Sequence, residues 1–216
     1  MSHGHYREAH PLVFVIMHFV NLISMIGLAF TGFYIHYPFF AWSMGAARAI
    51  HFVLMFVLVI NLTARVIMAF WVKDAVVPDS RDKDLDIKNW LPQRENRHQL
   101  WQQVKYYLFL RREHIISGKY GPLQKMAYLA SVVITYAMAY TGFALYNPAQ
   151  HWAIWPFFDA GVQAVGGLMA IRTIHFLGMW ALIVFTMAHV YLVNIHGIAP
   201  SRLMFAWIET PAREAD

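Results

Sequence analysis

Residues 171–190 read IRTIHFLGMWALIVFTMAHV, a strongly apolar stretch that nevertheless contains His175 and His189. The two histidines are fourteen residues apart, which is just under four turns of an α-helix. Their side chains therefore lie on nearly the same helix face, separated along the axis by about 21 Å. Ionisable residues at such a depth usually mark a functional site. The spacing indicates two separate ligand positions along one helix.

The composition of the 216-residue chain excludes an ordinary soluble domain, because 59% of the residues are hydrophobic and only 13% are charged. Four apolar segments lack Asp and Glu, and each is long enough to cross about 30 Å of hydrocarbon. These segments are residues 12–34, 46–72, 122–146 and 165–196. The first is too long for the apolar core of a secretory signal, so we expect it to be retained. The sequence predicts an all-α integral membrane four-helix bundle, with residues 1–216 as a single domain.

The distribution of charge predicts the orientation in the membrane. Residues 73–120 contain ten Lys or Arg, whereas the connections 35–45 and 147–164 contain none. By the positive-inside rule, the long loop and both termini are cytoplasmic. The same loop contains seven acidic residues, which argues against a nucleic-acid interface.

Within the cytoplasmic loop, residues 98–110 read HQLWQQVKYYLFL and predict an amphipathic helix on the inner leaflet. Its apolar side carries Leu100, Trp101, Val104, Tyr107 and Leu108, with Gln102, Gln103 and Lys105 turned elsewhere. Residues 78–96 are polar and contain two prolines, so they are predicted to be a loop. The outer turns are rich in aromatic residues, which suits the headgroup zone or a docking surface: Tyr34, Tyr37, Trp42, Trp152 and Trp155.

An internal duplication relates the two halves of the chain. RAIHF at residues 48–52 recurs as RTIHF at 172–176, and TGF at 31–33 recurs as TGF at 141–143. The chain therefore consists of two similar helix pairs. The copies have diverged, because Arg65 occupies the position of His189 and Tyr128 occupies that of His18. Four intramembrane histidines remain.

The four histidines fall into two pairs by depth: His51 with His175 near the outer side, and His18 with His189 near the inner side. Each pair could hold one haem iron between facing helices. An iron with two imidazole ligands has no vacant position for a substrate and passes single electrons. The chain has no cysteine, which excludes thiolate-held iron–sulfur clusters, disulfides and the covalent attachment of c-type haem.

Two arginines support the outer pair. Arg48 and Arg172 each precede a histidine of that pair by three residues. A guanidinium one turn nearer the surface could bind a haem propionate with two parallel hydrogen bonds. The alternative is an arginine that reaches from the helix end to the membrane surface.

Intramembrane histidines are also compatible with other functions. Histidines could hydrogen-bond across helices, or relay ions in a proton or metal transporter. The transporter hypothesis is weakened by the absence of an intramembrane carboxylate, and a passive anchor would leave four buried histidines unexplained. Five of the remaining histidines lie in polar segments, where we expect solvated side chains: His3, His5, His10, His98 and His114. His36 and His151 belong to the outer turns.

Taken together, the two histidine layers and five sequence stretches resemble the b-type cytochrome membrane subunit of respiratory nickel–iron hydrogenases. The stretches are RAIHF and RTIHF, FTMAHVYL at residues 185–192, YYLFL at 106–110 and ITYAMAYTGFALY at 134–146. The resemblance covers nearly the whole chain. Gamma subunits of formate dehydrogenases and thiosulfate-reductase cytochromes share the same four-helix dihaem architecture, and the fourteen-residue spacing does not separate these relatives.

The resemblance implies two haem b groups, with His18, His51, His175 and His189 as iron ligands, in a bacterial or archaeal cytoplasmic (inner) membrane. It implies a small iron–sulfur subunit and a large nickel–iron catalytic subunit on the outer face, so that the substrate site lies on a partner. A transmembrane helix of the small subunit would pack beside the cytochrome. Electrons would pass to menaquinone or ubiquinone near the inner haem.

Inward electron transfer over about 21 of about 30 Å opposes a negative-inside potential by about 1.6 kcal/mol per 100 mV. The inner haem or the quinone must therefore be the stronger electron acceptor. Polar residues in the right zone for quinone contacts each have an ordinary helix-end alternative. They are Tyr6, His10, Asn21, Arg65, Tyr191, Asn194 and His196.

Overall fold

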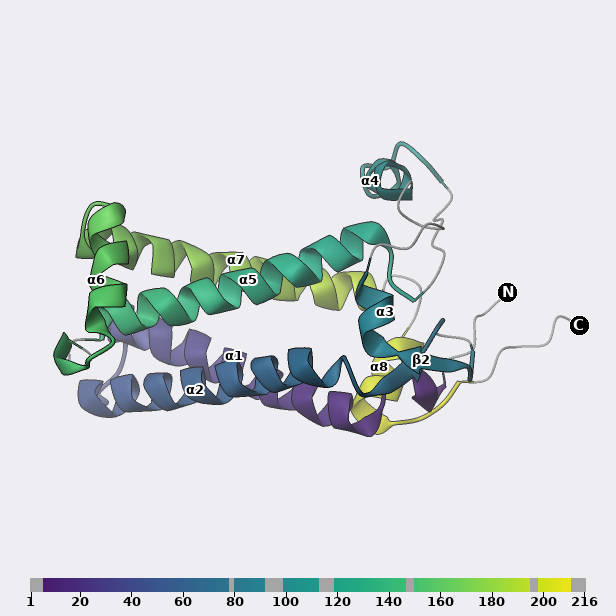
Figure 1. The fold of residues 1–216 in the computed structure, drawn as a ribbon, viewed down its shortest axis with the longest axis horizontal. Helices are drawn as coiled ribbons and strands as arrows, with labels where there is room; N and C mark the ends of the chain where they lie inside the picture. Colours follow the sequence, from purple (N-terminus) through teal and green to yellow (C-terminus); the bar gives the residue numbers. More distant parts are fainter. Residues whose placement is uncertain are drawn as a thin grey trace, which may run out of the picture. The chain divides into compact units, whose positions relative to one another are not determined.

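The computed structural model describes residues 6–77, 80–91, 99–112, 119–146, 150–194 and 198–210. Four long helices dominate it (Figure 1), namely α1 (Leu12–His36), α2 (Met44–Met68), α5 (Pro122–Leu145) and α7 (Leu168–Asn194). Each is long and apolar enough to cross a membrane, with mean hydropathy between 1.4 and 2.3. The predicted all-α membrane class and its four spans are confirmed, and the chain is a multi-pass membrane protein.

Two helix boundaries differ from the prediction by a few residues. Helix α2 ends at Met68 instead of residue 72, because Phe70 and Trp71 form the tighter hydrogen bonds of a turn. Helix α7 begins at Leu168 instead of residue 165. Gly166 and Gly167 precede it with φ of 94° and 105°, which is left-handed backbone that glycine adopts without strain.

The contacts of the chain group it into two compact units. Unit 1 comprises Met1–Leu22, Ile60–Leu129 and Val190–Asp216, and unit 2 comprises Ile23–Val59 and Ala130–His189. Each of the four long helices contributes one part to each unit. A single domain over residues 1–216 stays a prediction, as does the orientation with both termini inside.

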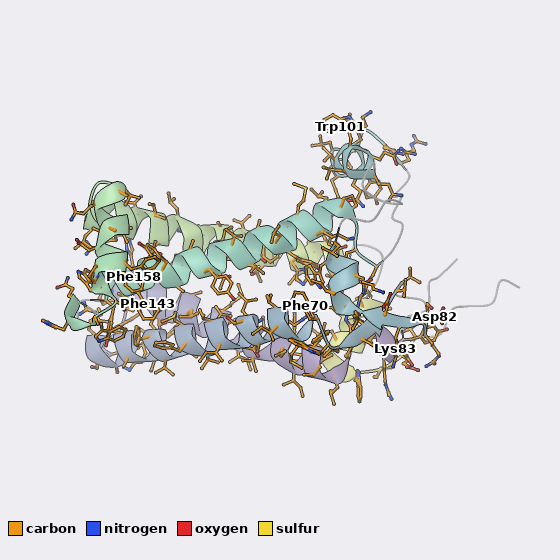
Figure 2. The ribbon with its side chains drawn as sticks, in the orientation of Figure 1. Phe70, Asp82, Lys83, Trp101, Phe143 and Phe158 are labelled. Carbon is orange, nitrogen blue, oxygen red and sulfur yellow. The ribbon has the colours of Figure 1, made fainter. Side chains whose placement is uncertain are left out.

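Unit 2 contains a short helix, α6 (Trp155–Ala164), which lies across the ends of α5 and α7 (Figure 1). Its buried residues Phe158 and Val162 form a hydrophobic cluster with Ala144 of α5 and Ile171 of α7. The rings of Phe143 and Phe158 lie parallel with centroids 5.4 Å apart (Figure 2). The sequence predicted only an outer turn here, so that prediction is wrong for residues 155–164. A proline in the first helical turn and the burial of Phe158 and Val162 account for the helix.

Tyr34 also differs from its prediction. Its side chain is buried, with 2% of its surface exposed, and is therefore not available to lipid headgroups. The hydroxyl donates a hydrogen bond to the carbonyl oxygen of Trp42 at 2.6 Å. Tyr34 therefore fixes the turn between α1 and α2, whereas Tyr37 is exposed as predicted.

Unit 1 contains a small antiparallel sheet of β1 (Lys73–Ala75) and β2 (Lys83–Leu85), in which Asp74 lies opposite Asp84. Helix α3 (Asp86–Trp90) follows directly. The predicted loop over residues 78–96 is therefore wrong for 83–90, while residues 78–79 and 92–98 lie outside the described residues. Elements of three to five residues have little local stability, and tertiary contacts form them here.

Helix α4 (Leu100–Tyr107) confirms the predicted amphipathic helix. Trp101 is 65% exposed and Leu108 is also exposed, so this apolar side is available to lipid. Gln103 is turned away from this side, as predicted, and is buried, where it accepts a hydrogen bond from the backbone N–H of Leu123 at 3.1 Å. Two further elements of unit 1 are the 3-10 helix η1 (Arg7–Ala9) and helix α8 (Ala199–Ala206).

Candidate functional site

Two histidines of the predicted site lie close together in unit 2, with their ring planes tilted by 59°. The ring centroids of His51 on α2 and His175 on α7 are 6.4 Å apart, and both side chains are partly buried. Each comes from one copy of the duplicated R-x-I-H-F sequence. The structure thus brings together the two residues that were predicted to pair because they lie at the same depth in their spans.

Thr31 of α1 holds the ring of His51. Its hydroxyl oxygen lies 2.9 Å from Nδ1 of His51 and 2.7 Å from the carbonyl oxygen of Gly27. A carbonyl can only accept, so the single hydroxyl hydrogen is donated to Gly27, and the hydroxyl oxygen accepts the N–H of Nδ1. This hydrogen-bond pattern assigns the hydrogen of His51 to Nδ1. The lone pair of Nε2 is left for a ligand.

Thr141 of α5 does the same for His175. Its hydroxyl oxygen lies 2.8 Å from Nδ1 of His175 and donates to the carbonyl oxygen of Ala137 at 2.8 Å. The same reasoning places the hydrogen of His175 on Nδ1 and the free lone pair on Nε2. The two repeats therefore build the same threonine–histidine pair twice.

A glycine lies beside each of these rings. A Cβ atom at Gly32 would lie 3.5 Å from Cε1 of His51, and one at Gly142 would lie 3.4 Å from Cε1 of His175. A larger side chain at either position would occupy the space of the ring. The roles of Thr31, Gly32, Thr141 and Gly142 were not predicted from the sequence. The recurrence of TGF was the signal, but nothing in the sequence showed which side chain each would contact.

The two arginines are exposed. Arg48 and Arg172 lie one turn before the histidines, and neither forms an ion pair within the part of the chain that the structure describes. Their predicted role toward a propionate stays a prediction.

The inner pair is divided between the units, with His18 in unit 1 and His189 in unit 2, so its predicted pairing stays a prediction. His18 is partly buried, and among the described residues its Nδ1 atom has no hydrogen-bond partner. The ring of His189 lies parallel to that of Phe185, with centroids 6.1 Å apart.

A polar contact between α1 and α2 lies next to His18 in sequence. The side-chain amide of Asn61 donates to the carbonyl oxygen of Met17 and to Oδ1 of Asn21, both at 2.7 Å. Interhelical hydrogen bonds of this kind stabilise membrane bundles by about 0.6 kcal/mol each. Asn21, which was predicted to lie in the quinone zone, thus has a structural partner.

Other residues of the predicted quinone zone also have partners. Arg65 forms an ion pair with Asp86 at 2.7 Å, and Asn194 accepts a hydrogen bond from the hydroxyl of Ser201 at 2.7 Å. The guanidinium of Arg81 lies over the ring of Tyr6, and Tyr191 is exposed. His196 lies outside the described residues, as do His3, His5, His98 and His114.

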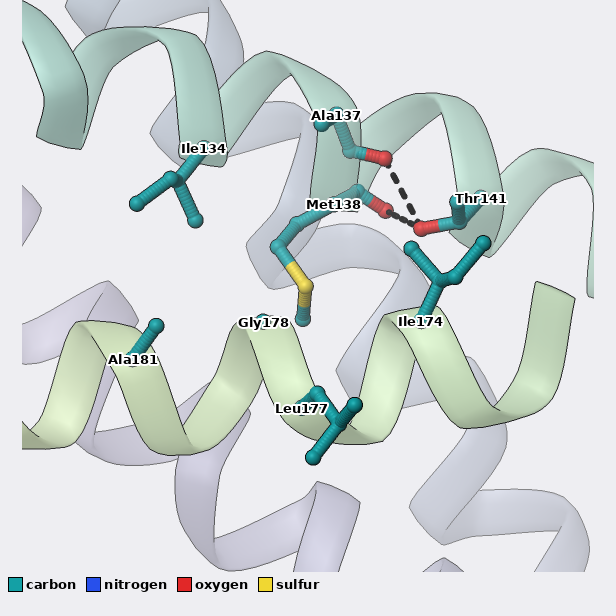
Figure 3. A pocket seen from close by; sticks show the side chains of 8 residues that line it. All are labelled: Ile134, Ala137, Met138, Thr141, Ile174, Leu177, Gly178 and Ala181. Carbon is teal, nitrogen blue, oxygen red and sulfur yellow. Dashed lines mark hydrogen bonds between the residues drawn. The ribbon is translucent and has the colours of Figure 1, made fainter. Parts of the chain in front are cut away.

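Helices α5 and α7 also border an apolar groove of about 330 Å³ in unit 2 (Figure 3). Met138 reaches across it toward Gly178, where an added Cβ would collide with the sulfur atom (Figure 3). The small residue therefore permits the close approach of the two helices. His175 does not line this groove, although Thr141 does.

The donor set of the site restricts the kind of metal centre. Within the described ranges there is no group of three or more His, Cys, Asp or Glu residues that could hold a metal ion. A pair of imidazoles suits an iron whose other ligands come from a macrocycle.

Comparison with known proteins identifies the family to which the chain belongs. The sequence profile described as prokaryotic cytochrome b561 matches residues 9–206. The chain belongs to this cytochrome family.

Several relatives of this cytochrome carry a more specific name. A protein of Azotobacter chroococcum mcd 1 is 32% identical over 196 residues, which cover 82% of this chain and 75% of that protein. A protein of Bradyrhizobium diazoefficiens is 30% identical over 219 residues, covering 87% and 80%. Both are named probable Ni/Fe-hydrogenase B-type cytochrome subunit. A protein of Escherichia coli K12, named probable Ni/Fe-hydrogenase 1 B-type cytochrome subunit, is 28% identical over 194 residues, covering 82% and 77%.

A cytochrome of b type implies haem b, and the residues present fit that group. The outer pair offers two Nε2 lone pairs, each with its ring held at Nδ1 by a hydroxyl. The spacing of 6.4 Å between ring centroids leaves room for one iron bound on both sides, since metal–imidazole bonds are about 2 Å long.

Proposed function

We propose that this cytochrome is the membrane subunit of a nickel–iron hydrogenase and passes electrons from the small iron–sulfur subunit on the outer face to membrane quinone. The names of its relatives support the hydrogenase partner. The His51–His175 pair, held in matched orientation by Thr31 and Thr141, is the observation that supports electron transfer most directly. The large nickel–iron subunit would carry the catalytic site for hydrogen.

In this proposal, Nε2 of His51 and Nε2 of His175 bind the outer haem, with Arg48 and Arg172 toward its propionates. A haem with two imidazole ligands takes up and releases one electron at a time. The protein would contribute a fixed orientation of the two imidazole rings. Both rings are fixed at Nδ1, so the ligand geometry does not have to rearrange when the charge changes.

His18 and His189 are the proposed ligands of a second haem b, nearer the cytoplasmic side. Menaquinone or ubiquinone would accept electrons there and take protons from the cytoplasm. The partner would release protons outside, so the pathway would conserve energy as half of a redox loop. The protein would lie in the inner membrane of a bacterium or archaeon.

Absorption spectroscopy tests the haem proposal. The dithionite-reduced minus oxidised spectrum of the purified protein should show b-type α and Soret bands, with two haems per chain. His51→Ala should remove one haem and keep the other. His36→Ala is the matched control, because His36 is an exposed histidine of unit 2 that only stacks on Phe176. A colourless wild-type protein, or a His51→Ala variant that keeps both haems, would contradict the proposal.

The electron donor needs a separate test. Membranes that contain the assembled complex should reduce quinone with hydrogen, and His51→Ala should abolish this activity while hydrogen oxidation with a soluble dye continues. Quinone reduction with formate in place of hydrogen, or quinol oxidation by thiosulfate, would assign the chain to a related complex.

A further inference from the structure

A buried cluster of charged residues in unit 1 has no role in the proposed electron path. Asp74 of β1 and Asp86 of α3 are 1% and 0% exposed, and Lys119, which precedes α5, is buried with them. Lys119 donates to a carboxyl oxygen of Asp74 and to the carbonyl oxygen of Ala9. Arg65 of α2 forms an ion pair with Asp86 at 2.7 Å. All of these residues lie in polar segments or at a helix end on the predicted cytoplasmic side.

The four carboxyl oxygens are not equally satisfied. Oδ1 of Asp74 accepts from the backbone N–H of Ala75 at 2.8 Å, and Oδ2 accepts from Lys119. Oδ2 of Asp86 accepts from Arg65 and from the indole N–H of Trp90 at 3.0 Å. Oδ1 of Asp86 is fully buried and has no hydrogen-bond donor within the described residues. A buried acceptor without a donor is strongly unfavourable, and a carboxylate even more so.

Asp74 is the side chain that can supply the missing donor. The backbone N–H of Asp86 donates to the carbonyl oxygen of Val72 at 3.0 Å, which places Asp86 beside β1 and Asp74. The carboxyl groups of Asp74 and Asp86 are within hydrogen-bonding reach of each other, but two carboxylates can bond only if one of them carries a proton. We propose that Asp74 and Asp86 form a proton-binding site, in which one proton bridges the two carboxyl groups and exchanges with the cytoplasmic side when the electron path beside His18 changes its charge.

The surrounding groups keep this proton exchangeable. Burial raises the pKa of Asp74 to about 6, Lys119 opposes the rise, and Asp86 adds to it by its hydrogen bond and its charge. Burial lowers the pKa of Lys119, and Asp74 opposes that change. Burial also raises the pKa of Tyr120 well above its usual value, so its hydroxyl stays protonated. With its pKa raised to about 6, Asp74 can bind and release a proton near neutral pH.

The connection to electron transfer rests on the proposed function. The guanidinium of Arg65 lies 3.5 Å from the ring centroid of Phe14, which is four residues before His18 and so on the same face of α1. Arg65 thus contacts both Phe14 and Asp86, and Asp86 in turn interacts with Asp74. Negative charge added beside His18 favours a proton on the pair, so an electron gained there would draw proton density from cytoplasmic water, up to one proton per electron.

Infrared spectroscopy of the full-length protein in lipid tests the site without reference to haem. Between pH 5 and pH 8, the wild-type difference spectrum should show loss of the C=O stretch of a protonated carboxylic acid, and this band should shift in D2O. The band should disappear from this pH range in Asp74→Asn and in Asp86→Asn. Asp84→Asn is the control and should keep it, because the side chain of Asp84 is 44% exposed and its carboxyl oxygens accept from Lys88 and from the backbone N–H of Leu85. A wild-type spectrum without the band, or a band that survives both substitutions, would overturn the site.

A redox titration tests the coupling. The haem that is lost in His18→Ala should become harder to reduce as the pH rises through the titration of the pair. The limit is a tenfold change in the redox equilibrium per pH unit, or about 59 mV for one electron. Asp74→Asn should remove this dependence. A haem with a pH-independent potential would overturn the coupling, whereas a protein without haem bands would instead contradict the proposed function.

Discussion

The hydroxyl of Thr141 accepts a hydrogen bond from Nδ1 of His175 at 2.8 Å, and the corresponding bond between Thr31 and His51 is 2.9 Å long. Each threonine also donates to a backbone carbonyl one turn earlier in its own helix. A hydroxyl that donates in this way can only accept from the imidazole. Both repeats of the sequence thus form the same threonine–histidine hydrogen bond. This bond fixes the orientation and the tautomer of each histidine ring.

Replacing Thr141 by valine should keep the outer haem but raise its midpoint potential. The bond to Nδ1–H makes the opposite nitrogen a stronger donor, which favours ferric iron. Loss of a hydrogen bond worth about 1 kcal/mol corresponds to roughly 40 mV for one electron. A spectroscopic redox titration measures the shift.

Thr135→Val is the matched control, because Thr135 is a buried threonine of α5 whose hydroxyl donates only to the carbonyl oxygen of Ser131. Its potentials should equal those of the wild type. Equal potentials in Thr141→Val and Thr135→Val would show that Thr141 does not position the ligand.

Hydropathy and spacing predicted much of the fold and part of the site. The four spans follow from segment length, and the His51–His175 pair follows from depth along two spans. The hydrogen-bond partners of the side chains could not be predicted from hydropathy or spacing. The TGF repeat was visible, but the sequence does not show which histidine Thr31 or Thr141 would face, since that depends on how the helices are rotated.

Short elements held by distant contacts were also missed. Helix α3 has five residues, and its first residue, Asp86, is fixed by Arg65 from α2. No local pattern encodes an ion pair between residues 21 positions apart. Helix α6 was missed because its aromatic residues suited a membrane-surface turn equally well, whereas Phe158 packs against α5.

Substitutions at Gly142 should show whether haem binding depends on the space beside the ring of His175. Gly142→Ala should retain the haem, since the new Cβ would lie 3.4 Å from Cε1 of His175, close to ordinary contact. Gly142→Leu should displace the ring and remove one of the two proposed haems, which would roughly halve the reduced α band. Haem content per chain is the measurement.

Gly45→Leu serves as the control, because the nearest atom to a Cβ at Gly45 is the Ser43 hydroxyl oxygen at 3.7 Å. It should bind haem like the wild type. Full haem content in Gly142→Leu would show that the ring of His175 is not confined by this glycine.

The carboxyl pair should make stability depend on pH. The pKa of Asp74 is raised from 3.8 to about 6 by burial, so the folded protein binds this proton more tightly than the unfolded chain does. The resulting stabilisation is fully present below about pH 4 and is lost as the pH rises through 6. Thermal unfolding in detergent should therefore show that the wild type loses stability between pH 5 and pH 7 relative to Asp74→Asn. A constant difference between the two proteins would contradict this.

Removal of the Arg65 side chain should be among the most damaging single changes in unit 1. Asp86 is fully buried, and its carboxylate would lose its cation at 2.7 Å, a type of change that costs about 3–5 kcal/mol. Arg65→Lys restores the charge without the planar group that stacks on Phe14, so an intermediate loss is expected. Arg81→Ala is the control, because Arg81 is an exposed arginine that pairs with Glu8 and Glu209 and should affect the melting temperature little. If Arg65→Ala melted at the temperature of Arg81→Ala, the pair with Asp86 would not stabilise the fold, and Asp86 would have to be held in another way.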